Sequence, residues 1–155
     1  VCAAMNAAFS GVVVSSGCAP EDGEWLRAAF SLLGDAEFTE EDKLDALTAL
    51  IGSGPAFFLE LLEGAALGGI QAGLPKALAY RGAAAAALGA ARLVTNSGRA
   101  PSDDLRDAVC TPGGMTIEGV AEIERRGVRG VMMDAVTSTA RKGSVLTHAV
   151  AESLR

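Results

Sequence analysis

The first part of the chain contains a short β-branched run, an amphipathic segment and a second short segment that could form a strand. Residues 11–16, "GVVVSS", form such a run between glycines and predict a strand. Residues 20–34 repeat apolar side chains at helical spacing after Pro20, which suits the first position of a helix. Residues 35–43 leave room for one more short strand. The pattern predicts a β-α-β unit, which is typical of the edge of a larger α/β domain.

The pattern then becomes helical. One helix is expected over residues 53–73, where Pro55 suits a position in the first turn. A second is expected between Pro75 and Gly98. Its middle, residues 82–91, is nearly all Ala and Gly, so it lacks a polar face and lets another helix approach closely. Such a helix is normally buried. In a chain of this size, it indicates that a second subunit helps to cover it.

Three further helices are predicted towards the C-terminus. A short one covers residues 101–109, and a helix of about ten residues follows the "TPGG" motif and ends at Gly127. The last helix begins at about Val128 and contains Gly143, which weakens a helix interior by about 1 kcal/mol relative to Ala. The predicted fold is therefore mainly α.

Composition and charge exclude several kinds of partner. Half of the residues are hydrophobic and 21% are charged, which is too apolar for a disordered chain. The net charge of −6 argues against nucleic acid and against an anionic membrane, because both require clustered Lys and Arg. The Ala-rich run lies between Arg81 and Arg92. It is much shorter than the about 20 apolar residues that a membrane-spanning helix requires. Neither a nucleic acid nor a membrane is expected as partner.

Cysteine and histidine predict no metal site. The three cysteines, Cys2, Cys18 and Cys110, form no C-x-x-C pair, and His148 is the single histidine. Reduced thiols packed as small hydrophobic groups are the simplest interpretation, which predicts a cytoplasmic protein. His148 is expected at a surface or an interface and not at a catalytic centre.

The stretch "AVCTPGGMTIEGV", residues 108–120, contains more special residues than a turn requires. Its proline biases Thr111 towards an extended conformation. Gly113 and Gly114 permit positive φ, so consecutive N–H groups can converge on one point. Thr116 lies where the next helix begins, so the free N–H groups and the positive helix end point to the same place. The motif suits a small carboxylate or a phosphate, but spacing alone leaves open a plain corner in which Thr116 only caps.

Two motifs, in their order and separation, resemble the pyrroline-5-carboxylate reductase family, which catalyses the last step of proline biosynthesis. "VCTPGGMTIEGVAEIE", residues 109–124, is similar to the family signature of Pro-Gly-Gly, a variable residue, Thr and a helix. Residues 44–94 resemble the region of long swapped helices, with Gly-Ser-Gly-Pro-Ala at 52–56. Residues 132–146 resemble the closing helix. The resemblance extends from about Gly11.

The resemblance implies a fold and an assembly. Residues 41–155 would form a helical dimerisation and substrate-binding domain with intertwined helices, like the C-terminal domain of 6-phosphogluconate dehydrogenase. Residues 1–40 would be the β-α-β remnant of a Rossmann dinucleotide-binding domain. The partner would be a second copy in a homodimer, and many family members form a ring of dimers. No Gly-x-Gly-x-x-Gly follows a strand, so cofactor-binding residues are not assigned and a C-terminal portion of such an enzyme is expected.

The resemblance also implies a chemistry. Thr111 and the N–H groups of Gly113, Gly114 and Met115 would hold the carboxylate of 1-pyrroline-5-carboxylate, an imino acid. Thr116 would be the catalytic residue and would hydrogen-bond the ring nitrogen. NADPH or NADH would supply the hydride in the full-length enzyme, without a metal. The isolated chain is expected to be inactive and not to bind the cofactor tightly.

Two alternatives stay open. Residues 1–5, "VCAAM", differ from the Met-Pro-Asn-Thr-Pro loop of the family, and Ile51 replaces a small polar residue. These differences suggest a non-catalytic helical dimerisation module derived from the family. A related dehydrogenase acting on another small imino or hydroxy acid is the second alternative.

Overall fold

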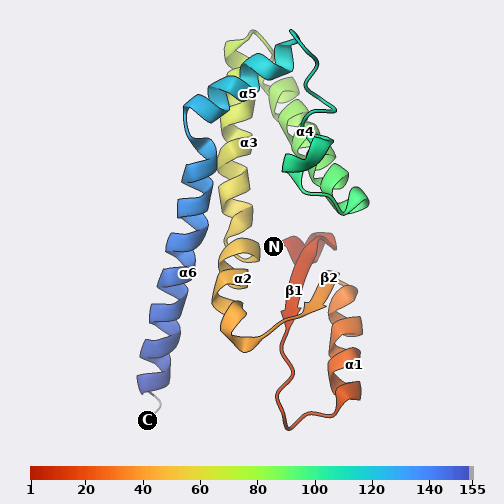
Figure 1. The fold of residues 1–155 in the computed structure, drawn as a ribbon, viewed down its shortest axis with the longest axis vertical. Helices are drawn as coiled ribbons and strands as arrows, with labels where there is room; N and C mark the ends of the chain where they lie inside the picture. Colours follow the sequence, from red (N-terminus) through yellow and green to blue (C-terminus); the bar gives the residue numbers. More distant parts are fainter. Residues whose placement is uncertain (154–155) are drawn as a thin grey trace. The chain divides into compact units, whose positions relative to one another are not determined.

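A computed structural model describes residues 1–153, apart from the side chains of residues 103 and 151 (Figure 1). The chain forms two compact units. One consists of Val1–Pro55 and Met133–Arg155, and the other of Ala56–Met132. The predicted mainly α fold is confirmed, because long helices make up most of the chain and the strands of the described part lie in the first unit.

The first unit contains a two-stranded parallel sheet. Strands β1 (Ala8–Val12) and β2 (Gly34–Phe38) are joined by helix α1 (Pro20–Ser31), which begins at the predicted proline. Figure 1 shows α1 next to the two strands. This arrangement confirms the predicted β-α-β unit. Short 3-10 turns precede and follow it, Cys2–Met5 and Glu41–Lys43.

Strand β1 begins and ends earlier than the strand predicted over residues 11–16. Its partner β2 has only five residues, so pairing ends with Val12 opposite Phe38, and the valines that follow have no strand beside them. Gly11 lies inside the strand, where an added Cβ would be 2.4 Å from Leu47 Cδ2. The glycine therefore lets helix α2 (Leu44–Ile51) pack directly on β1.

The second unit contains most of helix α3 (Gly54–Gln71) and all of helix α4 (Lys76–Ser97). Their bounds agree with the predicted helices to within two residues. At the hairpin between them, an added Cβ on Gly69 would lie 3.3 Å from the Cβ of Ala79. The two helices can approach at this point because both residues are small.

A hydrogen bond between side chains also links α3 and α4. The hydroxyl of Tyr80 donates to Glu63 Oε1 at 2.6 Å, and the ammonium of Lys76 lies 5.8 Å from the centre of the tyrosine ring. The hydrogen bond to the Glu63 carboxylate, with a smaller contribution from its charge, raises the pKa of the Tyr80 phenol above its usual value.

The remaining helices follow the predicted order. A π-helical turn (Pro101–Leu105) lies in the predicted short helix, α5 (Met115–Arg125) follows the glycine motif, and α6 (Val128–Ser153) is the long last helix. α6 continues through Gly143, whose added Cβ would lie 3.5 Å from Asp45 Oδ1. A side chain at this position would make only ordinary contact with that carboxylate, and the glycine does not interrupt the helix.

Few apolar side chains are buried. Among the side chains that the structure describes, the buried apolar residues are small, and no large side chain is fully buried. They are Val12, Ala36, Ala49, Ala66 and Ala79. On α3 and α4, by contrast, Phe58, Leu59 and Leu88 are 60%, 64% and 53% exposed. A chain of about 150 residues normally buries larger side chains, so these helices present an interaction surface.

By length and composition alone, one stretch of the described chain could cross a membrane. It runs from Glu41 to Gln71 and was not anticipated from the Ala-rich run. A core helix of a soluble protein passes the same test, so the stretch is weak evidence for a span. It is also interrupted at residues 52–53, between α2 and α3.

Candidate functional site

The predicted site residues lie in the second unit, in the loop that precedes α5. This glycine loop (residues 111–114) contains one residue in the left-handed region, Gly113, with φ of 69°. Gly114 is the N-cap of α5 and is extended, with φ of −80° and ψ of 173°. The expectation that both glycines use positive φ is therefore met only at Gly113.

Gly114 must be small because of its neighbour and not because of its backbone angles. An added Cβ would lie 2.3 Å from Thr111 Oγ1 and 3.1 Å from the Thr111 carbonyl oxygen. That carbonyl also accepts the N–H of Gly114 at 3.0 Å. The loop therefore closes on itself and holds the Thr111 hydroxyl beside the start of α5.

The N-terminus of α5 has unused donors. No side chain caps it. In the described structure, the N–H groups of Gly113, Met115 and Thr116 have no acceptor within the chain. Free N–H groups and the helix dipole make such a terminus attractive to an anion. Thr116 is the second residue of α5, and Gly114 occupies the cap position that the plain-corner interpretation gave to Thr116.

The predicted site residues are open to a ligand. Thr111 and Thr116 are exposed, and the Met115 residue is 94% exposed. The structure brings Thr111 and Gly114 into direct contact and places Met115 and Thr116 in the first turn of α5. The donors and hydroxyls of the predicted set therefore lie within one short loop and one helical turn.

An apolar pocket of about 300 Å³ adjoins this loop within the second unit. Thr116 and Val120 of α5 form one wall, and α4 and the segment that precedes the loop form the others. The remaining lining residues are Ala90, Leu93, Val94, Pro101, Leu105, Arg106, Val109 and Cys110. The sequence motif did not reveal these residues, because they come from separate elements. Such a pocket suits the hydrocarbon part of a small ligand or an apolar side chain.

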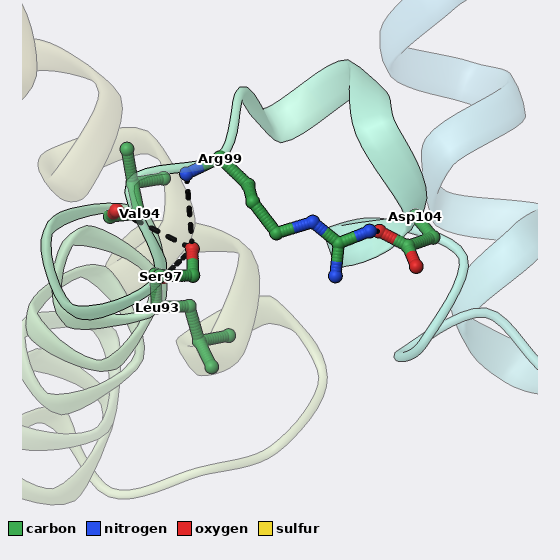
Figure 2. Close-up of polar contacts among 5 residues, drawn as sticks. All are labelled: Leu93, Val94, Ser97, Arg99 and Asp104. Atoms are coloured by element: carbon green, nitrogen blue, oxygen red, sulfur yellow. Dashed lines mark hydrogen bonds and ion pairs between the residues drawn. The ribbon is translucent and has the colours of Figure 1, made fainter.

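The segment between α4 and the glycine loop is called the entry arm (residues 98–110). Polar contacts stabilise the turn with which it begins (Figure 2). The hydroxyl of Ser97 donates to the carbonyl oxygens of Leu93 at 2.5 Å and Val94 at 3.4 Å, and accepts the N–H of Arg99 at 3.2 Å. The Arg99 side chain forms an ion pair with Asp104. These contacts turn the chain back directly after α4, beside the pocket.

The β-α-β unit does not fit a dinucleotide pyrophosphate. Between β1 and α1 the chain has no Gly-x-Gly-x-x-Gly, and the first turn of α1 carries Glu21 and Asp22. The N–H of Ala19 already donates to Asp22 Oδ2 at 3.3 Å. A bound pyrophosphate would therefore meet two carboxylates where a dinucleotide site offers free N–H groups.

Among the described side chains, the cysteine thiols and the imidazole take no part in the site's polar contacts. Cys2, Cys18 and Cys110 are free thiols. His148 is exposed, as predicted, and its Nδ1 lies 2.8 Å from the Ser144 carbonyl oxygen of the preceding helical turn. Within the described side chains, no group of three His, Cys, Asp or Glu residues is arranged to hold a metal ion.

Known proteins resemble the chain in sequence. A family described as "Pyrroline-5-carboxylate reductase dimerisation" matches residues 41–146. The pyrroline-5-carboxylate reductase of Glycine max is 39% identical over 145 residues, which is 94% of this chain and 53% of that protein. The chain therefore spans about half the length of the curated relatives that it matches at this coverage.

Solved structures show the same fold. A pyrroline-5-carboxylate reductase from Coxiella burnetii has a TM-score of 0.83 at 24% identity and covers 88% of this chain and 51% of that one. The pyrroline carboxylate reductase of Plasmodium falciparum, solved with NADP bound, has a TM-score of 0.76 at 23% identity and covers 87% and 52%. The family predicted from the two motifs is thus confirmed: the chain belongs to the pyrroline-5-carboxylate reductase family.

Proposed function

We propose that this chain is the substrate-binding and dimerisation portion of a pyrroline-5-carboxylate reductase, which converts 1-pyrroline-5-carboxylate to L-proline with NADPH or NADH. The observation that carries the proposal is the uncapped N-terminus of α5, where the Thr111 hydroxyl lies beside Gly114. Family membership supports the choice of substrate, because the matched relatives bear the name of this activity.

The carboxylate of the substrate would bind at the glycine loop. The free N–H groups of Gly113 and Met115 and the Thr111 hydroxyl supply donors for its two oxygens. The N–H of Gly114 already donates to the Thr111 carbonyl oxygen, so it would join only if that bond opened. The positive end of the α5 dipole adds a favourable charge of the kind that binds anions at helix N-termini.

Thr116 would act at the ring nitrogen. Adding a hydride to the carbon of the C=N bond leaves the electron pair of that bond on nitrogen, which then takes a proton. A hydroxyl both donates and accepts, so Thr116 can orient the imine and assist this proton transfer. The adjoining apolar pocket, which Thr116 lines, suits the methylene groups of the ring. Fixing the ring in one orientation provides much of the rate acceleration.

In this proposal the nicotinamide cofactor binds to the full-length enzyme. Pyrroline carboxylate reductase of Plasmodium falciparum was solved with NADP bound, which supports a nicotinamide cofactor for the family. Its pyrophosphate would have to bind outside the described β-α-β unit, which does not fit one. We expect the isolated chain to show no reductase activity.

The assembly in this proposal is a cytoplasmic homodimer with intertwined helices, and a ring of such dimers is its larger form. The exposed apolar side chains of α3 and α4 support it, because apolar helix faces of this kind require cover. The matched family is itself described by dimerisation.

Replacing Thr116 by Ala in the full-length enzyme tests the function. We expect kcat/KM for 1-pyrroline-5-carboxylate to fall at least about tenfold, because the hydroxyl acts at the reacting nitrogen. Thr137→Ala is the matched control, since the Thr137 hydroxyl bonds only within its own helix, at 2.9 Å to the Met133 carbonyl oxygen. Equal kcat/KM values for both variants would contradict the proposal.

Two other functions would give different results. A non-catalytic dimerisation module would bind no imino acid, and its assembly would be unaffected by Thr116→Ala. A related dehydrogenase would keep the requirement for Thr116 but prefer another substrate in a panel of small imino and hydroxy acids.

A further inference from the structure

Two glutamates near the end of α5 form ion pairs of different kinds. Glu122 pairs with Arg125 and Arg126, which follow it within a single turn. Glu124 instead pairs with residues outside its helix. Its Oε1 lies 3.8 Å from Arg106 Nη1 of the entry arm, and it also pairs with Arg129 in the first turn of α6. Glu124 therefore joins the two segments that precede and follow α5.

Arg106 stands at the point where the entry arm turns into the site. Its carbonyl oxygen accepts the N–H groups of Val109 at 3.0 Å and Cys110 at 3.1 Å, which start the turn into the glycine loop. Its side chain lines the pocket together with Thr116. Because the pocket surface is almost entirely apolar, the hydrocarbon stem forms this wall while the charged head pairs with carboxylates.

Apolar packing contributes little to holding the entry arm in place. Val109 is 55% exposed, and Leu105 and Cys110 are only half-buried. The far end of α5 can therefore be connected to the arm mainly through the pair of Arg106 with Glu124. Residue 124 lies nine positions beyond Met115, so the pair acts about 13 Å along the helix from the site.

The geometry points to Arg106 and Glu124 as positioning residues of the glycine loop. Their ion pair fixes the direction in which the entry arm approaches α5. It thereby sets where the Thr111 hydroxyl lies beside Gly114 at the start of α5. Neither charged group is available to the substrate carboxylate in this arrangement, because the Arg106 head group is directed to Glu124 and Asp107. The proposal rests on the proposed function of the loop as the carboxylate site.

The expected effect is modest and measurable. The side chains of Arg106 and Glu124 are 47% and 46% exposed, so water and salt screen the pair. Ion pairs of this exposure change an equilibrium by about two- to fivefold. The effect should therefore shrink in about 1 M salt, where charges are screened over about 3 Å.

Hydrogen exchange of the loop amides tests the positioning role without any ligand. In Glu124→Gln, we expect the hydrogen-bonded N–H groups of Cys110 and Gly114 to exchange about two- to fivefold faster at low salt. Glu122→Gln is the matched control and should leave them unchanged, because its ion pairs are local to α5. Equal exchange in the two variants would overturn the proposal.

A charge reversal separates electrostatics from a simple loss of packing. Arg106→Glu should accelerate exchange as Glu124→Gln does, and Arg106→Glu combined with Glu124→Arg should restore slow exchange. If the double variant exchanges as fast as Arg106→Glu alone, the pair does not position the loop.

Kinetics of the full-length enzyme then distinguish this proposal from the proposed function. With Glu124→Gln we expect KM for 1-pyrroline-5-carboxylate to rise about two- to fivefold while kcat changes less than twofold. If exchange accelerates and KM stays constant, the pair positions the loop but the loop is not the substrate site. If exchange stays constant, the positioning role is wrong whatever KM does.

Discussion

The contact between Thr111 and Gly114 makes a specific prediction for the variant Gly114→Ala. The backbone angles of Gly114, −80° and 173°, are accessible to alanine, so the substitution introduces no conformational strain. The added Cβ, however, would lie 2.3 Å from Thr111 Oγ1 and 3.1 Å from the Thr111 carbonyl oxygen. The hydroxyl must rotate away and the carbonyl must move by a few tenths of an ångström.

The expected loss of stability follows from three contributions. Crowding of this kind typically costs about 1–3 kcal/mol. Alanine is also a poorer N-cap than glycine, while its smaller unfolded-state entropy returns about 0.4–1 kcal/mol. We therefore expect Gly114→Ala to lower the free energy of unfolding by about 1–2 kcal/mol. Gly113→Ala should lower the free energy of unfolding by a similar amount, but for another reason. The space around residue 113 is open, whereas alanine is strained at its φ of 69°.

A double-mutant cycle with Thr111→Ala distinguishes the two causes. Removing the hydroxyl relieves the contact in Gly114→Ala but has no effect on the strained backbone of Gly113→Ala. Urea unfolding at one fixed protein concentration should give a coupling free energy of about 1 kcal/mol between positions 111 and 114, and about zero between 111 and 113. Additive losses for both pairs would show that the Thr111 hydroxyl does not lie beside Gly114.

Two further predictions concern α3 and α4. Tyr80 is the single tyrosine, so phenolate absorbance reports it alone, and its pKa should lie above about 10 and fall towards that value in Glu63→Gln. The raised pKa means that the stabilising hydrogen bond is present below about pH 10 and is lost as pH rises through the folded-state pKa; an unchanged midpoint in Glu63→Gln would contradict this. Leu88→Asp places a charge on the exposed apolar face of α4 and should shift the protein from dimer to monomer in light scattering at micromolar concentration, whereas an unchanged mass would remove α4 from the interface.

The features predicted well from the sequence depend on local backbone chemistry. Pro20 is the first residue of α1, and Pro75 and Gly98 cap the two ends of α4, because proline and glycine constrain the backbone wherever they occur. Strand β1 was predicted to lie further along the chain than it does. Its limits depend on the five residues of β2 and not on its own β-branched run. The role of Gly11 likewise depends on a contact with another element.

In the site, too, features of the local backbone could be predicted from the sequence, whereas contacts between elements could not. The position of Thr116 in the first turn of α5 follows from the motif, because a helix must begin after Pro-Gly-Gly. The reason for Gly114 does not follow, since it is a steric contact with Thr111 and not a positive φ. The pair of Arg106 with Glu124 is also invisible in the sequence, because a loop and a helix separate the two residues.

The central claim is that the glycine loop binds a carboxylate, and a titration observed by NMR tests it most directly. The chain labelled with ¹⁵N is titrated with L-proline, the product of the proposed reaction, and with L-prolinamide, which lacks the carboxylate charge. The account predicts saturable shifts in the amide signals of residues 113–116 with proline and much smaller ones with prolinamide. Equal responses to the two compounds, or no response at these amides at saturation, would contradict it.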